Sequence, residues 1–133
     1  MKQITIRTLR PPAKKNLKKD IEWFCHSLGL LGERDKKKSS FRIFETIVKA
    51  NRKNGISADE LARAVGMSRT AVMHHVNTMI MAGLVVKEGG RFELRMKSLQ
   101  KTVDEIELDI NRTLRAVREV AKDIDKRMNF PVR

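Results

Sequence analysis

The sequence predicts a mainly α-helical protein whose middle part folds as a small helical domain with a β-hairpin. Three observations support this prediction. Apolar residues recur at helical spacing, glycines follow the helical runs, and a Gly-Gly pair separates two short alternating runs. We expect three parts: a basic N-terminal arm and helix over residues 1–40, which ends in a linker over residues 29–40, the central domain over 41–96, and a long helix over 97–133.

The composition favours a polyanionic partner. The 133 residues include 29 Lys and Arg against 16 Asp and Glu, a formal net charge of +13, and such an excess is typical of nucleic-acid-binding proteins. No apolar run approaches the ~20 residues that span a bilayer. A lone cysteine, Cys25, leaves no intrachain disulfide framework and no Cys-based metal cluster. We therefore expect a cytoplasmic protein with no membrane association, no metal and no cofactor.

The chain shows none of the patterns that carry catalysis. Paired acid–base carboxylates, a nucleophile with its base, a phosphate-cradling glycine loop and metal-ligand spacing are all missing from the sequence. We therefore expect no enzymatic activity.

The first half of the central domain reads as helix, short strand, helix. Apolar residues at helical spacing predict a helix over residues 41–54, and Ile56 is expected to form a short strand. Ser57 and Glu60 have the spacing of a capping box, which predicts the start of a second helix over residues 58–65.

The second half adds another helix and the hairpin. Gly66 ends the second helix, and Ser68 is placed to cap a third, which Gly83 terminates. Residues 84–87 and 92–96 then predict two strands around a Gly-Gly turn. Two helices joined by a tight glycine-containing turn and followed by a hairpin make a winged helix-turn-helix domain, in which the third helix is the recognition helix.

The recognition helix also resembles a known family. The run Met67-Ser-Arg-Thr-Ala-Val-Met-His-His-Val-Asn-Thr-Met-Ile-Met-Ala-Gly-Leu-Val85 is similar to the Ser-His-His-Leu and Ala-Gly-Leu-Val signature of ArsR-type winged-helix repressors. The resemblance covers about residues 41–96 and implies a homodimer that binds operator DNA. Met73 stands where the family has a serine that is expected to face DNA. Residues 61–65 lack the cysteine of the metal-sensing members, so the resemblance implies no metal sensing.

Outward positions of the recognition helix supply the candidate base contacts. Arg69 suits guanine and Asn77 suits adenine, each with two hydrogen bonds, while Thr70 suits a phosphate or a thymine methyl. Cations of the neighbouring helices and of the hairpin extend this surface. The predicted nucleic-acid-binding residues are Arg69, Thr70, Met73, His74, Asn77, Arg52, Lys53, Arg63, Lys87, Arg91 and Arg95.

The histidine pair has a structural interpretation as well. One of His74 and His75 would hydrogen-bond inside the domain while the other is solvated. Adjacent helical residues point about 100° apart, so the pair does not predict a zinc site.

The N-terminal arm holds much of the positive charge. Residues 1–40 contain 11 Lys and Arg against 4 Asp and Glu. The alternation at Ile4 and Ile6 predicts a brief strand, and apolar spacing from Ala13 predicts an amphipathic helix that includes Leu17. The arm is expected to contact phosphates through Arg7, Arg10, Lys14, Lys15, Lys18 and Lys19. A solvated lysine face is the alternative.

The C-terminal helix predicts dimerisation. An apolar stripe at spacings of three and four, with one stutter, runs from Met96 to Met128. The helix is too long for the central domain to cover, which favours a second copy; an intramolecular brace is the alternative. The predicted interface is Leu99, Val103, Ile106, Ile110, Leu114, Val117, Ala121, Ile124 and Met128.

These features predict a dimeric winged-helix nucleic-acid-binding protein, a DNA-binding transcriptional regulator without metal sensing. A factor that binds ribosomal RNA or the ribosome through the basic arm is the first alternative, because RNA is read largely through shape and phosphates. A protein-interaction adaptor that uses a surface with Met73 and Met81 is the second alternative.

Overall fold

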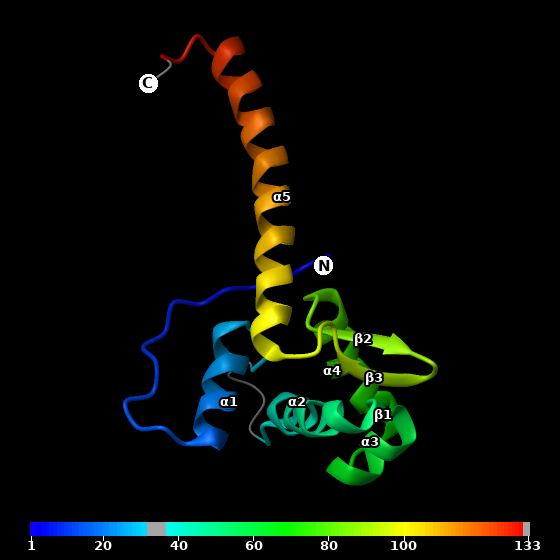
Figure 1. Ribbon diagram of the computed structural model, residues 1–133. Coiled ribbons are helices and arrows are strands. Elements are labelled where there is room, and N and C mark those ends of the chain that lie inside the picture. The colour runs from blue at the N-terminus through cyan, green and yellow to red at the C-terminus, as the bar shows by residue number, and fades with distance from the viewer. Residues whose placement is uncertain (32–36, 132–133) are drawn as a thin grey trace.

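The structure, a computed structural model that describes residues 1–31 and 37–131, is mainly helical (Figure 1). The strands form one antiparallel sheet in the order β1-β3-β2. This arrangement confirms the prediction of a winged helix-turn-helix domain with a long C-terminal helix. The elements are α1 (Leu17–Ser27), α2 (Ser39–Ala50), the 3-10 helix η1 (Asn51–Lys53), β1 (Ile56–Ser57), α3 (Ala58–Val65), α4 (Arg69–Met81), β2 (Val85–Glu88), β3 (Arg91–Leu94) and α5 (Leu99–Arg127).

The helix-turn-helix is set by its caps. The Ser57 hydroxyl accepts from the Glu60 amide at 3.2 Å, and the Glu60 carboxylate accepts from the Ser57 amide at 3.3 Å, which is the predicted capping box. Gly66 ends α3 with φ +68, a conformation that favours glycine. Ser68 then caps α4 by accepting from the Ala71 amide at 3.1 Å. Both helices therefore begin at the residues that the sequence predicts.

The wing is a tight hairpin. Gly89 and Gly90 have φ of +56 and +75, as a two-residue turn between right-twisted strands requires. Phe92 and Leu94 on β3 are buried, while Glu93 between them points to the other face, opposite Val86.

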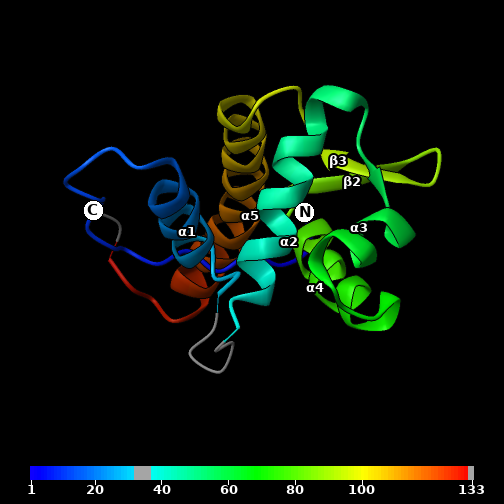
Figure 2. The same cartoon turned by 90° about the horizontal axis from the view of Figure 1, so that it is seen from below.

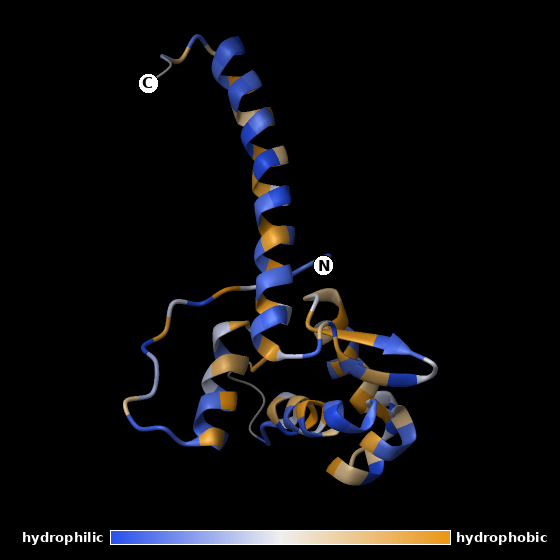
Figure 3. Cartoon of the chain, in the orientation of Figure 1, coloured by the Kyte–Doolittle hydropathy of each residue, from blue (hydrophilic) through white to orange (hydrophobic). Residues whose placement is uncertain are grey.

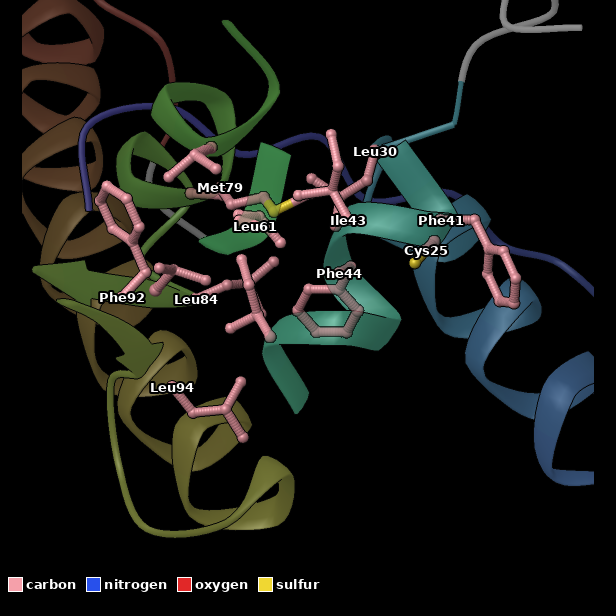
Figure 4. Packing of buried hydrophobic residues seen from close by; sticks show 14 of the residues in the cluster. Cys25, Leu30, Phe41, Ile43, Phe44, Leu61, Met79, Leu84, Phe92 and Leu94 are labelled. Carbon is pink, nitrogen blue, oxygen red and sulfur yellow. The ribbon is translucent and has the colours of Figure 1, made fainter. Parts of the chain in front are cut away.

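The buried face of α2 forms the centre of the core. Ile43, Phe44 and Ile47 have no exposed surface, and the Phe44 ring stacks on Phe24 of α1 with 5.6 Å between centroids. Figure 2 shows α2 between α1 on one side and α3 and α4 on the other. Figure 4 shows the side chain of Leu61, from α3, among other core residues that lie beside α2.

The N-terminal helix is shorter than predicted. It begins at Leu17 with Asn16 as its cap, because the Asn16 side chain accepts from the Lys19 amide. Leu17 is therefore at the first position and is 72% exposed, whereas Ile21 and Cys25 are buried. The predicted linker over residues 29–40 is also partly structured, since its first apolar residues are buried and α2 begins within it. Residues 32–36 of that linker lie outside the described residues.

The predicted strand at Ile4 and Ile6 does not form. The amides of Lys2 and Gln3 donate to the Met81 carbonyl at 2.7 and 3.1 Å, and the Arg7 amide donates to the carbonyl at the end of α1 at 2.8 Å. The segment therefore runs from the C-terminal end of α4 to that of α1 without pairing with the sheet, and Ile4 packs against the core.

The C-terminal helix begins after Met96, the first residue of the predicted apolar stripe. Ser98 is the N-cap, so Met96 precedes the helix. Thr102 is fully buried; its hydroxyl donates to the Ser98 carbonyl at 2.8 Å and accepts from the Met96 amide at 3.1 Å. Ile106 is 3% exposed, whereas every described residue from 111 onward is exposed. The first half of α5 therefore packs on its own domain and the second half projects (Figure 1).

We predict that Thr102→Val destabilises the protein by about 1–2 kcal/mol, because the Met96 amide loses its acceptor in a closed part of the fold. Thr113→Val is the matched control on the same helix: its hydroxyl bonds only to the Asp109 carbonyl in an exposed position, and we expect a change within about 0.5 kcal/mol. Urea unfolding at constant slope measures both. Equal effects of the two substitutions would contradict the prediction.

Candidate nucleic-acid interface

The exposed face of α4 carries the predicted base contacts. Thr70, His74 and Asn77 are exposed and follow one another at helical spacing, so they form one stripe. Val72 and Val76 face the opposite way and are buried. The stripe is therefore held rigidly by the core behind it and faces solvent with hydroxyl, imidazole and amide groups.

Arg69 stands at the start of this stripe in a weak ion pair. Its guanidinium lies 3.2 Å from the Asp59 carboxylate of α3, and both side chains are about two-thirds exposed, at 66% and 69%. Exposed pairs of this kind contribute about 0–1 kcal/mol. Asp59 therefore orients Arg69 at small cost and releases it readily to a stronger acceptor.

Met73 does not belong to the exposed stripe. It is half-buried and packs against the core, while Met81 at the end of the helix is 41% exposed. The surface expected for a protein-interaction adaptor is therefore reduced mainly to Met81. Position 73 therefore contributes apolar packing between α4 and the core rather than an exposed group.

The two histidines take different roles, as the structural interpretation expected. His75 Nδ1 lies 2.7 Å from the Ser40 hydroxyl of α2, and Ser40 is itself buried. His74 is exposed beside it. His75 therefore fastens the recognition helix to α2, and His74 is available to a ligand.

Arg91 of the wing is a structural residue. Its guanidinium lies 3.0 Å from the Glu60 carboxylate and donates to the carbonyl oxygens of Gly55 at 2.8 Å and Asn54 at 3.3 Å. Hydrogen bonds from Ser57 and then the charge of Arg91 hold the pKa of Glu60 below its usual range. Arg91 thus ties β3 to the start of α3 rather than reaching outward.

Arg95, another predicted contact, points toward α5. It forms an ion pair with Asp109 at 2.5 Å and lies 3.9 Å from Glu105, and Asp109 also pairs with Arg112 at 2.8 Å. The hydrogen bond from Arg95 is the main cause that lowers the pKa of Asp109. Arg95 therefore joins the wing to the long helix.

The remaining candidate cations are exposed. Lys87 of β2 lies over the Phe92 ring, 5.9 Å from its centroid. The others are Arg52 and Lys53 of η1, Arg63 of α3, and Arg7, Arg10, Lys14, Lys15, Lys18 and Lys19 of the arm. The structure thus separates exposed surface cations, which suit phosphates, from Arg91 and Arg95, which form ion pairs between elements of the fold.

Sequence reasoning missed the contact between the N-terminal segment and the recognition helix. The amides of Lys2 and Gln3 bond to the Met81 carbonyl, so the segment begins where α4 ends. Backbone bonds between remote segments leave no pattern in a sequence. The consequence is that the N-terminal segment is anchored at the C-terminal end of α4, where Lys2 is exposed.

Among the described residues, neither a group of metal-ligating side chains nor a helix able to span a membrane is found. In residues 1–31 and 37–131, no three His, Cys, Asp or Glu side chains are grouped so as to hold a metal ion. Burial raises the pKa of the Cys25 thiol to about 12, with smaller contributions from Glu22 and Glu45, so the thiolate that a metal requires is disfavoured. Within the described part of the chain, no helix is long and apolar enough to cross a membrane.

The comparison with protein families agrees with this geometry. Residues 37–86 match the family described as winged helix-turn-helix DNA-binding. The match begins just before α2 and ends within β2, so it contains the complete helix-turn-helix and only the start of the wing. This part of the chain therefore carries a DNA-binding type of fold, while the ArsR-type subfamily stays a prediction. The comparisons with curated proteins and with solved structures found no match.

The Arg95–Asp109 pair predicts a pH dependence of stability. Because the folded pKa of Asp109 is lowered, its contribution is fully present above the unfolded value of about 3.9 and is lost as pH falls through the lower folded pKa. Asp109→Asn should lower stability at pH 7 and flatten the decline below about pH 4. Asp104→Asn, an exposed acid on the same helix, is the control. Thermal unfolding between about pH 2 and 7 measures both; identical profiles for the wild type and Asp109→Asn would refute the pairing.

Proposed function

We propose that this protein is a homodimeric transcriptional regulator that binds double-stranded DNA and does not sense metals. The observation that supports it most is the exposed polar stripe of α4, formed by Thr70, His74 and Asn77 with Arg69 at its start, inside a domain that matches DNA-binding winged helices. Hydrogen-bonding groups on the exposed face of a rigid helix are what major-groove readout needs.

The proposed contacts fall into two classes. Arg69 and Asn77 read base edges, and Thr70 and His74 support them from the same stripe. The exposed cations of η1, α3, the wing and the arm bind phosphates, which provides affinity without sequence information. Met73, Arg91 and Arg95 are left out of this set, because the first packs inward and the other two are engaged within the fold.

The proposed homodimer rests on the projecting half of α5. Its apolar stripe is exposed beyond the domain, with Leu114, Val117, Ile124 and Met128 at 50%, 59%, 48% and 60%. Figure 3 shows hydrophobic residues recurring along this otherwise hydrophilic helix. A helix in water gains most of its stability from packing an apolar face, so the exposed stripe of α5 needs a partner surface to pack against. Ile106 is excluded from the interface, since it is buried in its own domain.

Base readout makes a direct prediction. Asn77→Ala should relax the sequence preference at one definable base pair and cost about 1–3 kcal/mol of specific binding, and Arg69→Ala should do the same at a second position. Selection of binding sites from genomic DNA fragments, followed by competition titrations, measures both effects. Arg115→Ala, an exposed arginine on α5, is the control and should leave the preference unchanged. Unaltered specificity in both α4 variants would overturn the assignment of α4 as the reading helix.

The dimer makes a second prediction. Val117→Asp should produce monomers, because it places a charge within the stripe that a partner must cover. Leu108→Asp is the matched control, since Leu108 is 50% exposed but lies on the opposite face of the same helix. Light scattering across a concentration series gives the mass. A monomeric wild type, or a dimeric Val117→Asp variant, would contradict the proposal.

RNA is the second candidate partner, and the basic arm favours it. Six exposed cations follow one another along residues 7–19, outside the matched domain. Replacing Lys14, Lys15, Lys18 and Lys19 with Gln should lower the slope of log K against log salt by up to about 3.6 for duplex DNA, if every lysine contacts a phosphate. Measuring the same variant on structured RNA separates the candidates: loss of RNA binding with intact operator binding would assign the arm to RNA.

A further inference from the structure

We infer that two copies pair their α5 helices antiparallel, and that Phe130 of each copy docks in a groove beside the N-terminal segment of the other. This inference rests on the homodimer proposed above and adds the direction, the register and a second contact. Three observations on the projecting half of α5 support it.

The first observation is the distribution of charge beside the stripe. The exposed seam runs through Leu114, Val117, Ala121, Ile124 and Met128 at alternating spacings of three and four. Arg118 and Asp125 each follow a seam residue directly, so they lie one heptad apart on the same edge of the helix. The opposite edge carries Thr113, Val120 and Arg127, with no acid among them.

A parallel pair would bring unlike edges together. Arg118 would then face the partner's Thr113, and Asp125 would face the partner's Val120, so that neither charge would find an opposite one. An antiparallel pair brings like edges together. With Val117 opposite the partner's Met128 and Ala121 opposite the partner's Ile124, Arg118 lies beside the partner's Asp125, and the two-fold symmetry repeats the pair.

The second observation is a groove where this register ends. The N-terminal segment and α5 enclose a groove of about 490 Å³ that is lined mainly by apolar side chains, including Ile4, Ile6, Ile110 and Leu114. Ile6 is 61% exposed, so a partner side chain that covered it would remove further apolar surface from water. The groove continues the seam toward the domain, so it belongs to the same docking surface.

The third observation is the residue that the register brings to this groove. Met128 opposite the partner's Val117 places the next residues, up to Pro131, opposite the partner's Leu114. Phe130 is 52% exposed, and its amide donates to the Asp125 carbonyl at 2.9 Å, which turns the chain back against the end of the helix. An aromatic ring buries about 150–250 Å², so Phe130 is the side chain that can cover Ile6 and Leu114.

The test of direction is a charge exchange. Arg118→Asp and Asp125→Arg, made singly, each place like charges together twice in the antiparallel dimer and should weaken it roughly tenfold. The double variant should restore the wild-type dissociation constant, as measured by sedimentation equilibrium at low salt. Two results would overturn the antiparallel register: single variants that do not weaken the dimer, or weakened single variants that the double variant does not rescue. These residues do not meet in a parallel pair.

A cysteine experiment gives an independent result. The variants Val117→Cys and Met128→Cys are prepared separately and mixed, so that the dimers can exchange subunits, and the mixture is then oxidised. The antiparallel register predicts a disulfide between the two different variants and little within either one, whereas a parallel pair predicts the reverse. Mass spectrometry identifies the linked species, and the buried Cys25 is too enclosed to compete.

Phe130→Ala and Ile6→Ala test the groove. Each should raise the dissociation constant of the dimer, and the double variant should add little to either single one, since the two side chains are proposed to cover each other. Leu17→Ala, 72% exposed on α1, is the control. Fully additive effects would refute the groove contact. A monomeric wild type would instead refute the proposed homodimer itself, so the two failures are distinguishable.

Discussion

The buried face of α2 is the contact on which the rest of the structure depends. Ile43, Phe44 and Ile47 are completely enclosed, and α2 packs against α1, α3, α4 and β3. Hydrogen bonds add to this apolar contact at both ends: Ser40 meets His75 of α4, and the Asn51 side chain, just beyond α2, accepts from the Leu94 amide of β3 at 3.0 Å. The recognition helix and the wing are therefore positioned by the same helix.

The basic residues divide into two groups that composition cannot separate. Arg91 and Arg95 look like wing cations in the sequence, yet each is paired with carboxylates across elements. The lysines of the arm and the cations of η1 are exposed instead. The net charge of +13 consequently overstates what the winged helix itself offers to a polyanion, and the arm gains importance for any phosphate contact.

Local signals predicted most of the central domain. The capping box at Ser57, the cap at Ser68 and the Gly-Gly turn each act within a few residues, so their effect can be inferred from the sequence. The strand expected at Ile4 and Ile6 was wrong, because that segment bonds to Met81, far away in the chain. Burial was equally hard to infer at Met73, where helical position suggested exposure and packing against the core decided otherwise. The apolar stripe does lie along one long helix, as the sequence predicts. Only the structure shows that the first half of this helix packs on its own domain while the second half is exposed.

The point at which α5 leaves its own domain determines the orientation of the projecting half. The first half of α5 is fixed to the domain through Thr102, Ile106 and the Asp109 pair, so the projecting half leaves the domain at a set angle and phase. Each residue added within the projecting half would shift its tip by about 1.5 Å and turn it by about 100°. An insertion of about seven residues nearly restores the phase while lengthening the helix by about 10 Å, whereas an insertion of about two or about five residues would turn the stripe by about 200° or about 140°, away from its partner. The projecting half of α5 can therefore change in length by steps of about seven residues without turning its apolar stripe away from the partner.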